Sequence, residues 1–252
     1  MDKKYKIGLM WFRRDLRVAD NAALYHALRA CQQVLCVFVF DRDILDALPR
    51  ADRRVEFIRE SVVELDEQLR QHGLDHGIEQ AGLLVRHETA TSALPALSQR
   101  LSVDAVFASH DDEPQSLARD AAVQALLAAQ GVAFHSVKDH VVFERGEVLT
   151  LAGKPYSVFT PYKNAWLKKI NAFYLSAYPV EKHLGALASR PEGERQPVPT
   201  LATLGFAPTN LAALKIPTGS RGADALLDDF LGRIARYQDT RDFPAVKGPS
   251  YL

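Results

Sequence analysis

Residues Val34–Phe40 read VLCVFVF, an apolar run with no polar alternation. A strand covered by helices on both faces has this pattern, whereas a half-exposed strand alternates apolar and polar residues. A second run, Tyr5–Phe12 (YKIGLMWF), predicts a neighbouring buried strand. The Ala/Leu-rich stretch that ends at Ala30 predicts a helix between them, with Asp20 or Asn21 as its N-cap. Such a strand–helix–strand unit predicts parallel strands joined by a right-handed crossover.

Strand and helix signals keep alternating up to about residue 140. Asp52–Gly73 predicts an amphipathic helix with Gly73 as its stop, because apolar residues recur at spacings of three and four. The remaining predicted elements are strands at Leu83–Arg86, Ala105–Ser109 and Val132–Val137 and helices at Leu94–Leu101 and from Pro114 to Gly131. The predicted fold is α/β, a doubly wound, mostly parallel, five-stranded Rossmann-like sheet.

The pattern changes after residue 140. Residues 141–151 predict an irregular or hairpin segment, and a helix is expected from Pro161 in an aromatic-rich stretch. Five prolines between residues 189 and 222 exclude a long regular element there and indicate a linker over the surface. A helix is expected over 223–237, and its apolar face comprises Leu226, Leu227, Phe230, Leu231 and Ile234.

Composition and motifs exclude several classes. With 252 residues, 47% apolar and 25% charged, the chain is typical of a globular protein rather than a disordered, collagen-like or coiled-coil one. It has neither an apolar run of ~18 residues nor the pattern of a signal peptide. Cys31 and Cys36 make no disulfide framework, which favours a reducing, cytoplasmic setting. CxxC, HExxH, P-loop and GxGxxG motifs are absent from the sequence, so we predict no metal site and no NAD-type site.

The net charge of zero conceals an asymmetry. Residues 1–150 hold 18 Lys and Arg against 23 Asp and Glu (−5), and residues 151–252 hold 13 against 8 (+5). The basic half indicates either a polyanionic partner or an ordinary fluctuation. Within it, Tyr162, Lys163, Trp166, Lys168 and Lys169 interleave aromatic and basic residues, which is typical either of a nucleic-acid groove or of an amphipathic helix with a lysine-rich solvent face.

Two charged clusters follow predicted strands. Arg13-Arg14-Asp15-Leu16-Arg17 comes directly after the first strand, where an open α/β sheet binds its ligands. It predicts either phosphate contacts or a salt-bridged surface loop. Asp111-Asp112-Glu113 precedes a helix, and acids at that position are favourable through the helix dipole alone.

Four stretches of the chain, in this order, resemble the DNA photolyase/cryptochrome family. They are Met10–Asn21 (MWFRRDLRVADN), Ala118–Asp120 (ARD), Tyr156–Trp166 (YSVFTPYKNAW) and Tyr237 with Arg241–Val246 (RDFPAV). The resemblance is strongest to the N-terminal portion of bacterial class I cyclobutane pyrimidine dimer photolyases. It implies an α/β antenna domain at 1–140, a connecting segment and linker at 141–222, and the start of a helical FAD-binding domain at 223–252.

The function that this resemblance implies is light-dependent DNA repair. In the family, photoexcited reduced FAD donates an electron that splits a cyclobutane pyrimidine dimer, so the flavin supplies the chemistry and the protein its surroundings. The implied partner is damaged DNA, bound by a full-length protein that is a monomer. The chain of 252 residues alone is expected to be inactive.

The resemblance also assigns site residues. Those implied to contact FAD are Tyr237, Ser250, Tyr251 and Leu252, and Arg241 is implied to contact DNA phosphate. Pro249 departs from the family pattern, because a small hydroxyl residue usually precedes the serine. The alternatives are core packing for Tyr237 and a local ion pair between Arg241 and Asp242.

The sequence leaves the identity of the antenna chromophore open. Folate-binding members of the family carry an Asn-Glu pair where this chain has Gln115 and Ser116, and a hydroxyl in place of a carboxylate removes an acceptor for pterin N–H groups. Methenyltetrahydrofolate, a deazaflavin, a flavin or an empty site are the alternatives.

Two other functions compete with repair. A cryptochrome, which signals in blue light, has the same fold, and the sequence up to residue 252 does not separate it from a repair enzyme. A stand-alone nucleotide-binding α/β domain of the universal-stress type is the other. Tyr156–Trp166 and Arg241–Val246 argue against it, since such a domain has no use for them.

Overall fold

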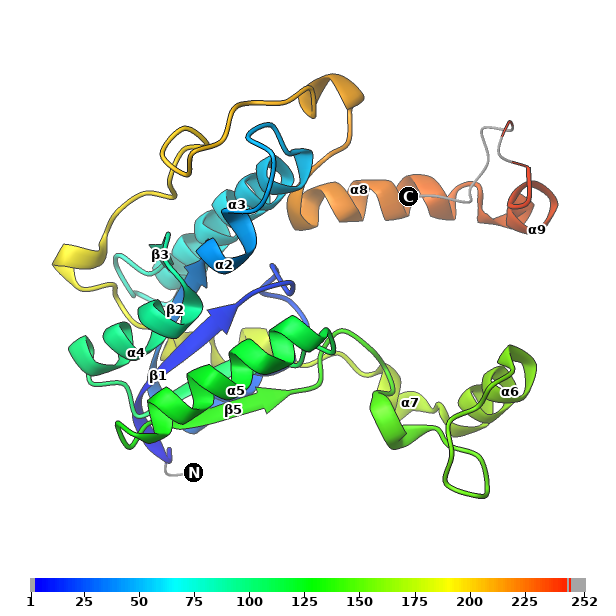
Figure 1. The fold of residues 1–252 in the computed structure, drawn as a ribbon, viewed down its shortest axis with the longest axis horizontal. Helices are drawn as coiled ribbons and strands as arrows, with labels where there is room; N and C mark the ends of the chain where they lie inside the picture. Colours follow the sequence, from blue (N-terminus) through cyan, green and yellow to red (C-terminus); the bar gives the residue numbers. More distant parts are fainter. Residues whose placement is uncertain (1–2, 244, 246–252) are drawn as a thin grey trace.

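A five-stranded, wholly parallel sheet forms the centre of the protein (Figure 1). The computed structural model describes residues 3–243 and 245. The strands are β1 (Tyr5–Phe12), β2 (Cys31–Val39), β3 (Leu83–Arg86), β4 (Ala105–Ser109) and β5 (Ala133–Val137). Their order across the sheet is β3-β2-β1-β4-β5. This confirms the predicted doubly wound α/β fold.

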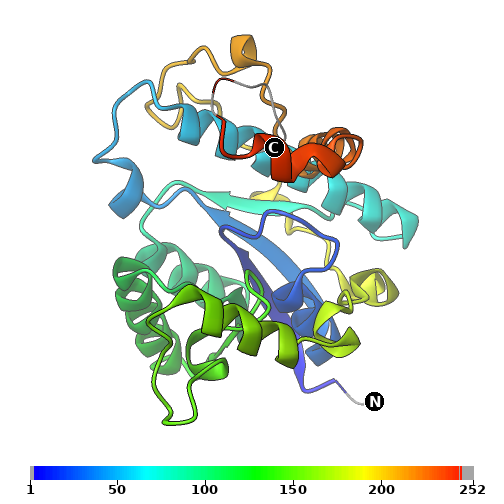
Figure 2. The ribbon, with the colours of Figure 1, turned by 90° about the vertical axis from the view of Figure 1, so that its right-hand side faces the viewer.

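Helices cover both faces of the sheet (Figure 2). They are α1 (Ala22–Ala30) and α3 (Arg53–Asp75) on one face, and α4 (Ala90–Arg100) and α5 (Pro114–Ala128) on the other. Alternate residues of one strand therefore enter two cores: Met10 and Phe12 pack toward α1 and α3, and Leu9 and Trp11 pack toward α4 and α5. Burial on both faces explains the apolar stretches Leu9–Phe12 of β1 and Val34–Val39 of β2.

Side-chain caps fix the starts of α1 and α3, and one predicted helix stop is wrong. Asn21 caps α1 by accepting a hydrogen bond from the amide of Leu24, and Asp52 caps α3. Gly73 does not end α3, which continues to Asp75. A Cβ at Gly73 would lie 2.4 Å from the Cβ of Ala81, so this glycine permits close packing. The chain turns instead at Gly77, whose φ is +70°.

Residues 148–178, here called the arm, project from the sheet (Figure 1). The segment before it contains a 3₁₀ turn, η1 (Arg145–Glu147), rather than a hairpin. The arm holds α6 (Phe159–Lys169) and α7 (Ala172–Leu175). α6 begins two residues before the predicted Pro161, which lies in the first helical turn, where a backbone N–H has no intrahelical partner to lose.

Residues 187–218, here called the strap, contain only short 3₁₀ turns, as the prolines predict. Its turns are η3 (Glu192–Glu194) and η4 (Ala212–Leu214), and η2 (Val180–Ala186) directly precedes the strap. The strap is more than a surface linker, because Leu204 and Phe206 join the core beside α1 and α3. Arg190 is also buried against Asp66 of α3, with Nη1 3.8 Å from the carboxylate.

The helix predicted over 223–237 differs in extent. α8 spans Gly219–Leu231 and is followed by η5 (Ile234–Arg236) and α9 (Tyr237–Thr240). The apolar face of α8 is partly exposed to solvent, since Leu227 is 45% and Leu231 is 54% exposed. Among the described residues, no helix is both long and apolar enough to cross a membrane.

Candidate functional site

A pocket of about 260 Å³ opens where side chains beyond the carboxyl ends of β1, β2 and β4 converge. The crossovers that leave β1 and β4 run to opposite faces of the sheet, so the strand order reverses at this point. Open α/β sheets bind ligands at such a position. We call this site the aromatic pocket.

Three buried aromatic residues give the pocket its name: Trp11, Phe38 and Phe40. The rings of Phe38 and Phe40 meet edge to face, with centroids 4.9 Å apart. The guanidinium groups of Arg13 and Arg119 lie 4.6 and 5.0 Å from the ring centroid of Trp11. A wall of aromatic rings suits a flat heterocycle that can stack on it.

Asp41 supplies the buried carboxyl group of the pocket. One oxygen accepts a hydrogen bond of 3.2 Å from the amide of Asp43, at the start of the short helix α2 (Arg42–Leu45). The other oxygen, Oδ2, is buried and has no hydrogen-bond partner among the described residues, although Nη1 of Arg119 lies 3.8 Å away. Burial raises the pKa of Asp41, against the opposing effects of the Asp43 amide, the Arg119 charge and the Ala90 amide. The group can therefore accept a ligand N–H, or donate when it is protonated.

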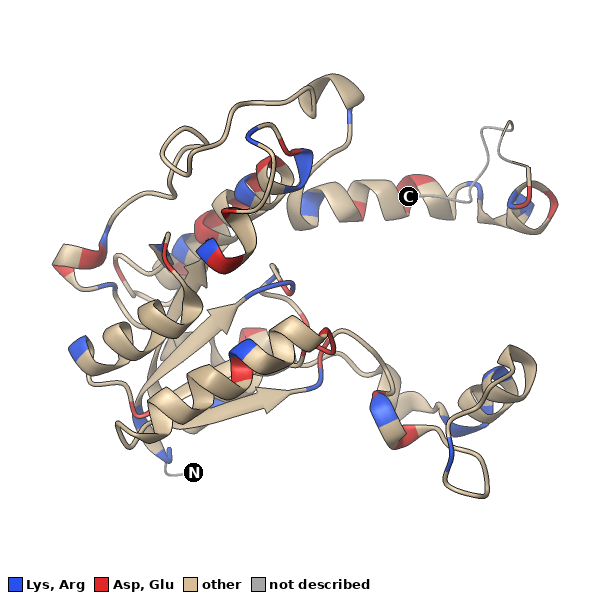
Figure 3. Ribbon diagram, viewed as in Figure 1, with Lys and Arg blue, Asp and Glu red and all other residues tan. Residues whose placement is uncertain are grey.

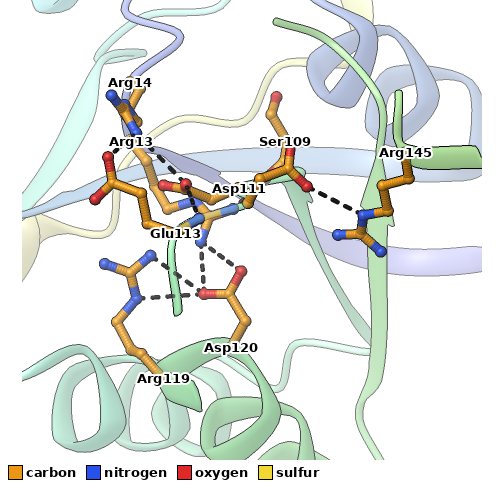
Figure 4. A network of polar contacts seen from close by, with 9 residues as sticks. Arg13, Arg14, Ser109, Asp111, Glu113, Arg119, Asp120 and Arg145 are labelled. Carbon is orange, nitrogen blue, oxygen red and sulfur yellow. Dashed lines mark hydrogen bonds and ion pairs between the residues drawn. The ribbon is translucent and has the colours of Figure 1, made fainter. Parts of the chain in front are cut away.

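The arginines that follow β1 are all held by carboxylates (Figure 4 shows two of them). Nη1 of Arg13 lies 2.6 Å from Asp120, and Nη1 of Arg14 lies 3.0 Å from Glu113. Arg17 pairs with Asp139 at 2.9 Å. The salt-bridged loop is therefore the interpretation that the structure confirms for this cluster.

The two predicted antenna residues differ in position. Ser116 lines the aromatic pocket, whereas Gln115 is exposed at the start of α5 and lies outside the pocket lining. Burial would raise the pKa of Asp111, but hydrogen bonds from the Glu113 amide and Ser116 and the nearby charges of Arg14 and Arg13 lower it overall. Asp111 thus lines the pocket as an anion.

The basic residues of α6 divide between a contact with Phe143 and the solvent. Trp166 contacts Phe143 edge to face with centroids 5.7 Å apart, and Nζ of Lys169 lies 4.9 Å from the same ring. Lys163 and Lys168 are exposed instead (Figure 3 shows basic residues and no acidic ones along α6). Phe159 of the same helix is 72% exposed, so α6 presents both lysines and an aromatic ring to solvent, and the choice between a nucleic-acid groove and an amphipathic helix stays a prediction.

Tyr237 and Arg241 lie together at the carboxyl end of the described chain. The ring of Tyr237 meets Phe230 edge to face at 6.1 Å, and the Arg241 guanidinium lies 5.9 Å from the ring. Arg241 also pairs with Asp242 at 3.5 Å. Ser250, Tyr251 and Leu252 fall outside the described residues.

Sequence reasoning did not single out Asp41 or the Phe38–Phe40 pair as site residues. The signal was present, because Asp41 follows directly after the most apolar strand. Among residues 3–243 and 245, no group of three or more His, Cys, Asp or Glu side chains is placed to hold a metal ion.

Comparisons with known proteins give one consistent result. The family model described as DNA photolyase matches residues 8–182. A deoxyribodipyrimidine photo-lyase of Halobacterium salinarum is 34% identical over 97% of this chain and 50% of its own length.

Solved structures agree on the fold. A class III photolyase from Agrobacterium tumefaciens superimposes with a TM-score of 0.77 at 24% identity, over 98% of this chain and 49% of that one. A second match is a Sulfolobus tokodaii photolyase, whose structure is described with two FAD molecules and as implying a novel light-harvesting cofactor. It superimposes with a TM-score of 0.67 at 23% identity, over 96% of this chain and 49% of that one. The chain thus spans about half the length of the relatives that it matches. Because the family model covers more than half of this sequence, the chain belongs to the DNA photolyase family.

Proposed function

We propose that this chain forms the N-terminal part of a light-dependent DNA repair enzyme that splits cyclobutane pyrimidine dimers, with an antenna chromophore in the aromatic pocket. Family membership and the name of the Halobacterium salinarum relative support the repair activity. The observation that carries the antenna role is the buried Oδ2 of Asp41 beside the aromatic wall, because among the described residues it accepts no hydrogen bond and has only the Arg119 guanidinium at 3.8 Å.

The pocket favours a flavin or deazaflavin ring over a folate. Asp41 is the pocket carboxylate beside the aromatic wall that has an oxygen without a hydrogen bond among the described residues, and Asp111 already accepts from the Glu113 amide and Ser116. Ser116 supplies a hydroxyl where folate-binding members have a carboxylate. A flat ring lying along Trp11 would present an N–H to Asp41 and its face to Arg119. The second FAD in the Sulfolobus tokodaii photolyase is consistent with this choice.

We place the catalytic flavin and DNA near Tyr237 and Arg241. Reduced FAD, when bound, supplies an electron to the lesion on excitation by blue light. Tyr237 is 39% exposed and offers one ring surface, while Arg241 adds a cation that suits a DNA phosphate. Ser250, Tyr251 and Leu252 complete the proposed FAD contacts. A monomeric full-length enzyme in the cytoplasm is part of the same proposal, and the two free buried thiols are consistent with that location.

Binding of riboflavin and of methenyltetrahydrofolate to the purified chain tests the antenna role. In a Trp166→Phe variant Trp11 is the one remaining tryptophan, so quenching of its fluorescence reports on the aromatic pocket. We expect riboflavin to quench it saturably and methenyltetrahydrofolate to do so more weakly. Asp41→Leu should weaken riboflavin binding about tenfold or more, because the ligand N–H loses its acceptor.

A matched control is Asp46→Asn, which alters an exposed carboxylate one turn away. Unchanged Trp11 fluorescence at riboflavin concentrations up to the solubility limit would contradict a flavin antenna in this pocket.

A further inference from the structure

A second pocket, of about 490 Å³, lies beyond the carboxyl end of β3. Its walls come from α2 and the segment after it, from His87, and from residues 203–206 of the strap. Leu45 of α2 lines both this pocket and the aromatic pocket, whose further walls include Asp41 and Ile44 of the same segment. The two pockets are therefore neighbours across α2, which Figure 1 shows near α3.

The second pocket carries an uncompensated positive charge. Arg42 is paired with Asp46, with Nη2 2.9 Å from the carboxylate, so this pair contributes no net charge. Arg50 has no carboxylate within ion-pair distance among the described residues, and its Nη1 donates to the carbonyl of Gly205 at 2.6 Å. The remaining guanidinium nitrogens can bind an anion, since Arg carries five N–H donors.

His87 adds a buried polar atom to the same wall. It follows β3 directly, and its Nε2 is shielded from solvent with no hydrogen-bond partner among the described residues. A buried ring nitrogen without a partner is costly. Because the structure shields this nitrogen from solvent, a ligand oxygen reaches it only when the surrounding side chains move, and then relieves that cost. Thr203 lines the pocket as well and offers a hydroxyl.

Arg50 is held in position by the strap. The carbonyl of Arg50 accepts a hydrogen bond of 2.7 Å from the amide of Ala207, while its side chain reaches back to Gly205. Gly205 has a φ of +83°, and a Cβ there would lie 2.6 Å from Nη1 of Arg50. The glycine thus lets the guanidinium approach the loop, and a side chain fixed in advance loses less entropy when a ligand binds.

We propose that this second pocket, named here the Arg50–His87 pocket, is a phosphate site. Two sources fit the chemistry: free inorganic phosphate, or the phosphate of a flavin nucleotide whose ring occupies the aromatic pocket across Leu45. The nucleotide source rests on the proposed antenna function, whereas the phosphate site itself does not.

The comparison of FMN with riboflavin isolates the phosphate. In the Trp166→Phe chain we expect FMN to bind about ten- to a hundredfold more tightly than riboflavin, the gain of a charge-assisted hydrogen bond to phosphate. Arg50→Gln and, separately, His87→Gln should reduce this ratio toward one and leave riboflavin affinity unchanged. Arg54→Gln is the matched control, because Arg54 is exposed beside Asp52 and lines neither pocket.

Inorganic phosphate alone gives an independent readout. It should shift the imidazole resonances of His87 saturably in NMR spectra, and Arg50→Gln should abolish that shift while Arg50→Lys retains part of it. Thermal unfolding of each variant without ligand checks that the strap remains folded.

The outcomes separate the two proposals. Equal affinities for FMN and riboflavin, together with no shift of His87 by phosphate, overturn the phosphate site even if riboflavin fills the aromatic pocket. A phosphate shift without any flavin binding supports the site with free phosphate as its source, and contradicts the flavin antenna instead.

Discussion

Arg13 donates from one nitrogen, Nη1, to both carboxylate oxygens of Asp120, at 2.6 and 2.7 Å. The side chains are only 7% and 14% exposed, so the pair joins the loop after β1 to α5 inside the protein. The same guanidinium covers the ring of Trp11. This ion pair therefore supports the floor of the aromatic pocket.

Asp120→Asn should lower the free energy of unfolding by about 3 kcal/mol, because it leaves the Arg13 charge buried without its partner. Urea denaturation measures the loss. Asp46→Asn breaks a pair in which both side chains are more than half exposed, and should cost less than about 1 kcal/mol. Equal costs for the two variants would show that the Arg13–Asp120 pair is not a buried support.

Glu194→Gln should release the strap. The Glu194 carboxylate is buried between Arg86 and Arg100, and a neutral amide leaves both cations uncompensated. We expect a loss of about 2–4 kcal/mol and faster protease cleavage within residues 187–218. Glu192→Gln, an exposed position in the same 3₁₀ turn, is the control and should behave as the unaltered chain.

Asp41 and Asp111 should respond to pH with opposite signs. Burial raises the pKa of Asp41 above 3.8, so its ionised form costs stability at neutral pH. Asp41→Asn, which keeps the cap to the Asp43 amide, should stabilise the protein at pH 7. That effect should fade as the pH falls through the raised pKa of Asp41, and should be gone below about 3.8.

For Asp111 the net shift of the pKa is downward, because its hydrogen bonds and the arginines outweigh burial. The ionised Asp111 therefore stabilises the protein at pH values above 3.8, its ordinary pKa, and this stabilisation is lost as the pH falls through the lowered pKa. Asp111→Asn should destabilise the protein at pH 7, with a difference that shrinks in acid. The free energy of unfolding, measured from pH 3 to 7 for both variants, tests whether the two substitutions change stability in opposite directions.

Leu227 and Leu231 should matter for association more than for folding. Both side chains are about half exposed on α8, so the double substitution by Glu should change unfolding by less than about 1 kcal/mol in total. It should also reduce any concentration-dependent self-association seen by sedimentation, because a bare apolar face is a contact surface. Leu69→Ala, fully buried in α3, is the contrast and should cost about 2–5 kcal/mol.

The purified chain of 252 residues should split no thymine dimers in blue light, even with reduced FAD added. Among the described residues Tyr237 and Arg241 are the proposed contacts, and a cofactor site buries most of its ligand. Chromatographic counting of dimers in illuminated DNA is the measurement. Repair above a light-only sample would contradict this expectation.

The sheet was predictable because its signals are local. The bounds of β1, β3 and β4 match the predicted strands, since the part of a strand that is covered on both faces must be apolar. Asn21 and Asp52 likewise mark helix starts through contacts within their own turn. The helix end predicted at Gly73 is wrong because this glycine permits close packing against Ala81, a contact with a residue beyond the end of the helix.

The sequence alone determined the order and type of the elements of the sheet domain, together with the family resemblance carried by its motifs. The tertiary structure decided what the charged residues do. The Arg13–Arg17 cluster suits phosphate or carboxylate equally, and it meets carboxylates because Asp120 and Asp139 come from distant parts of the chain. The aromatic pocket and the Arg50–His87 pocket also arise only on folding, because each joins strand ends to a helix or to the strap, and no local pattern encodes that proximity.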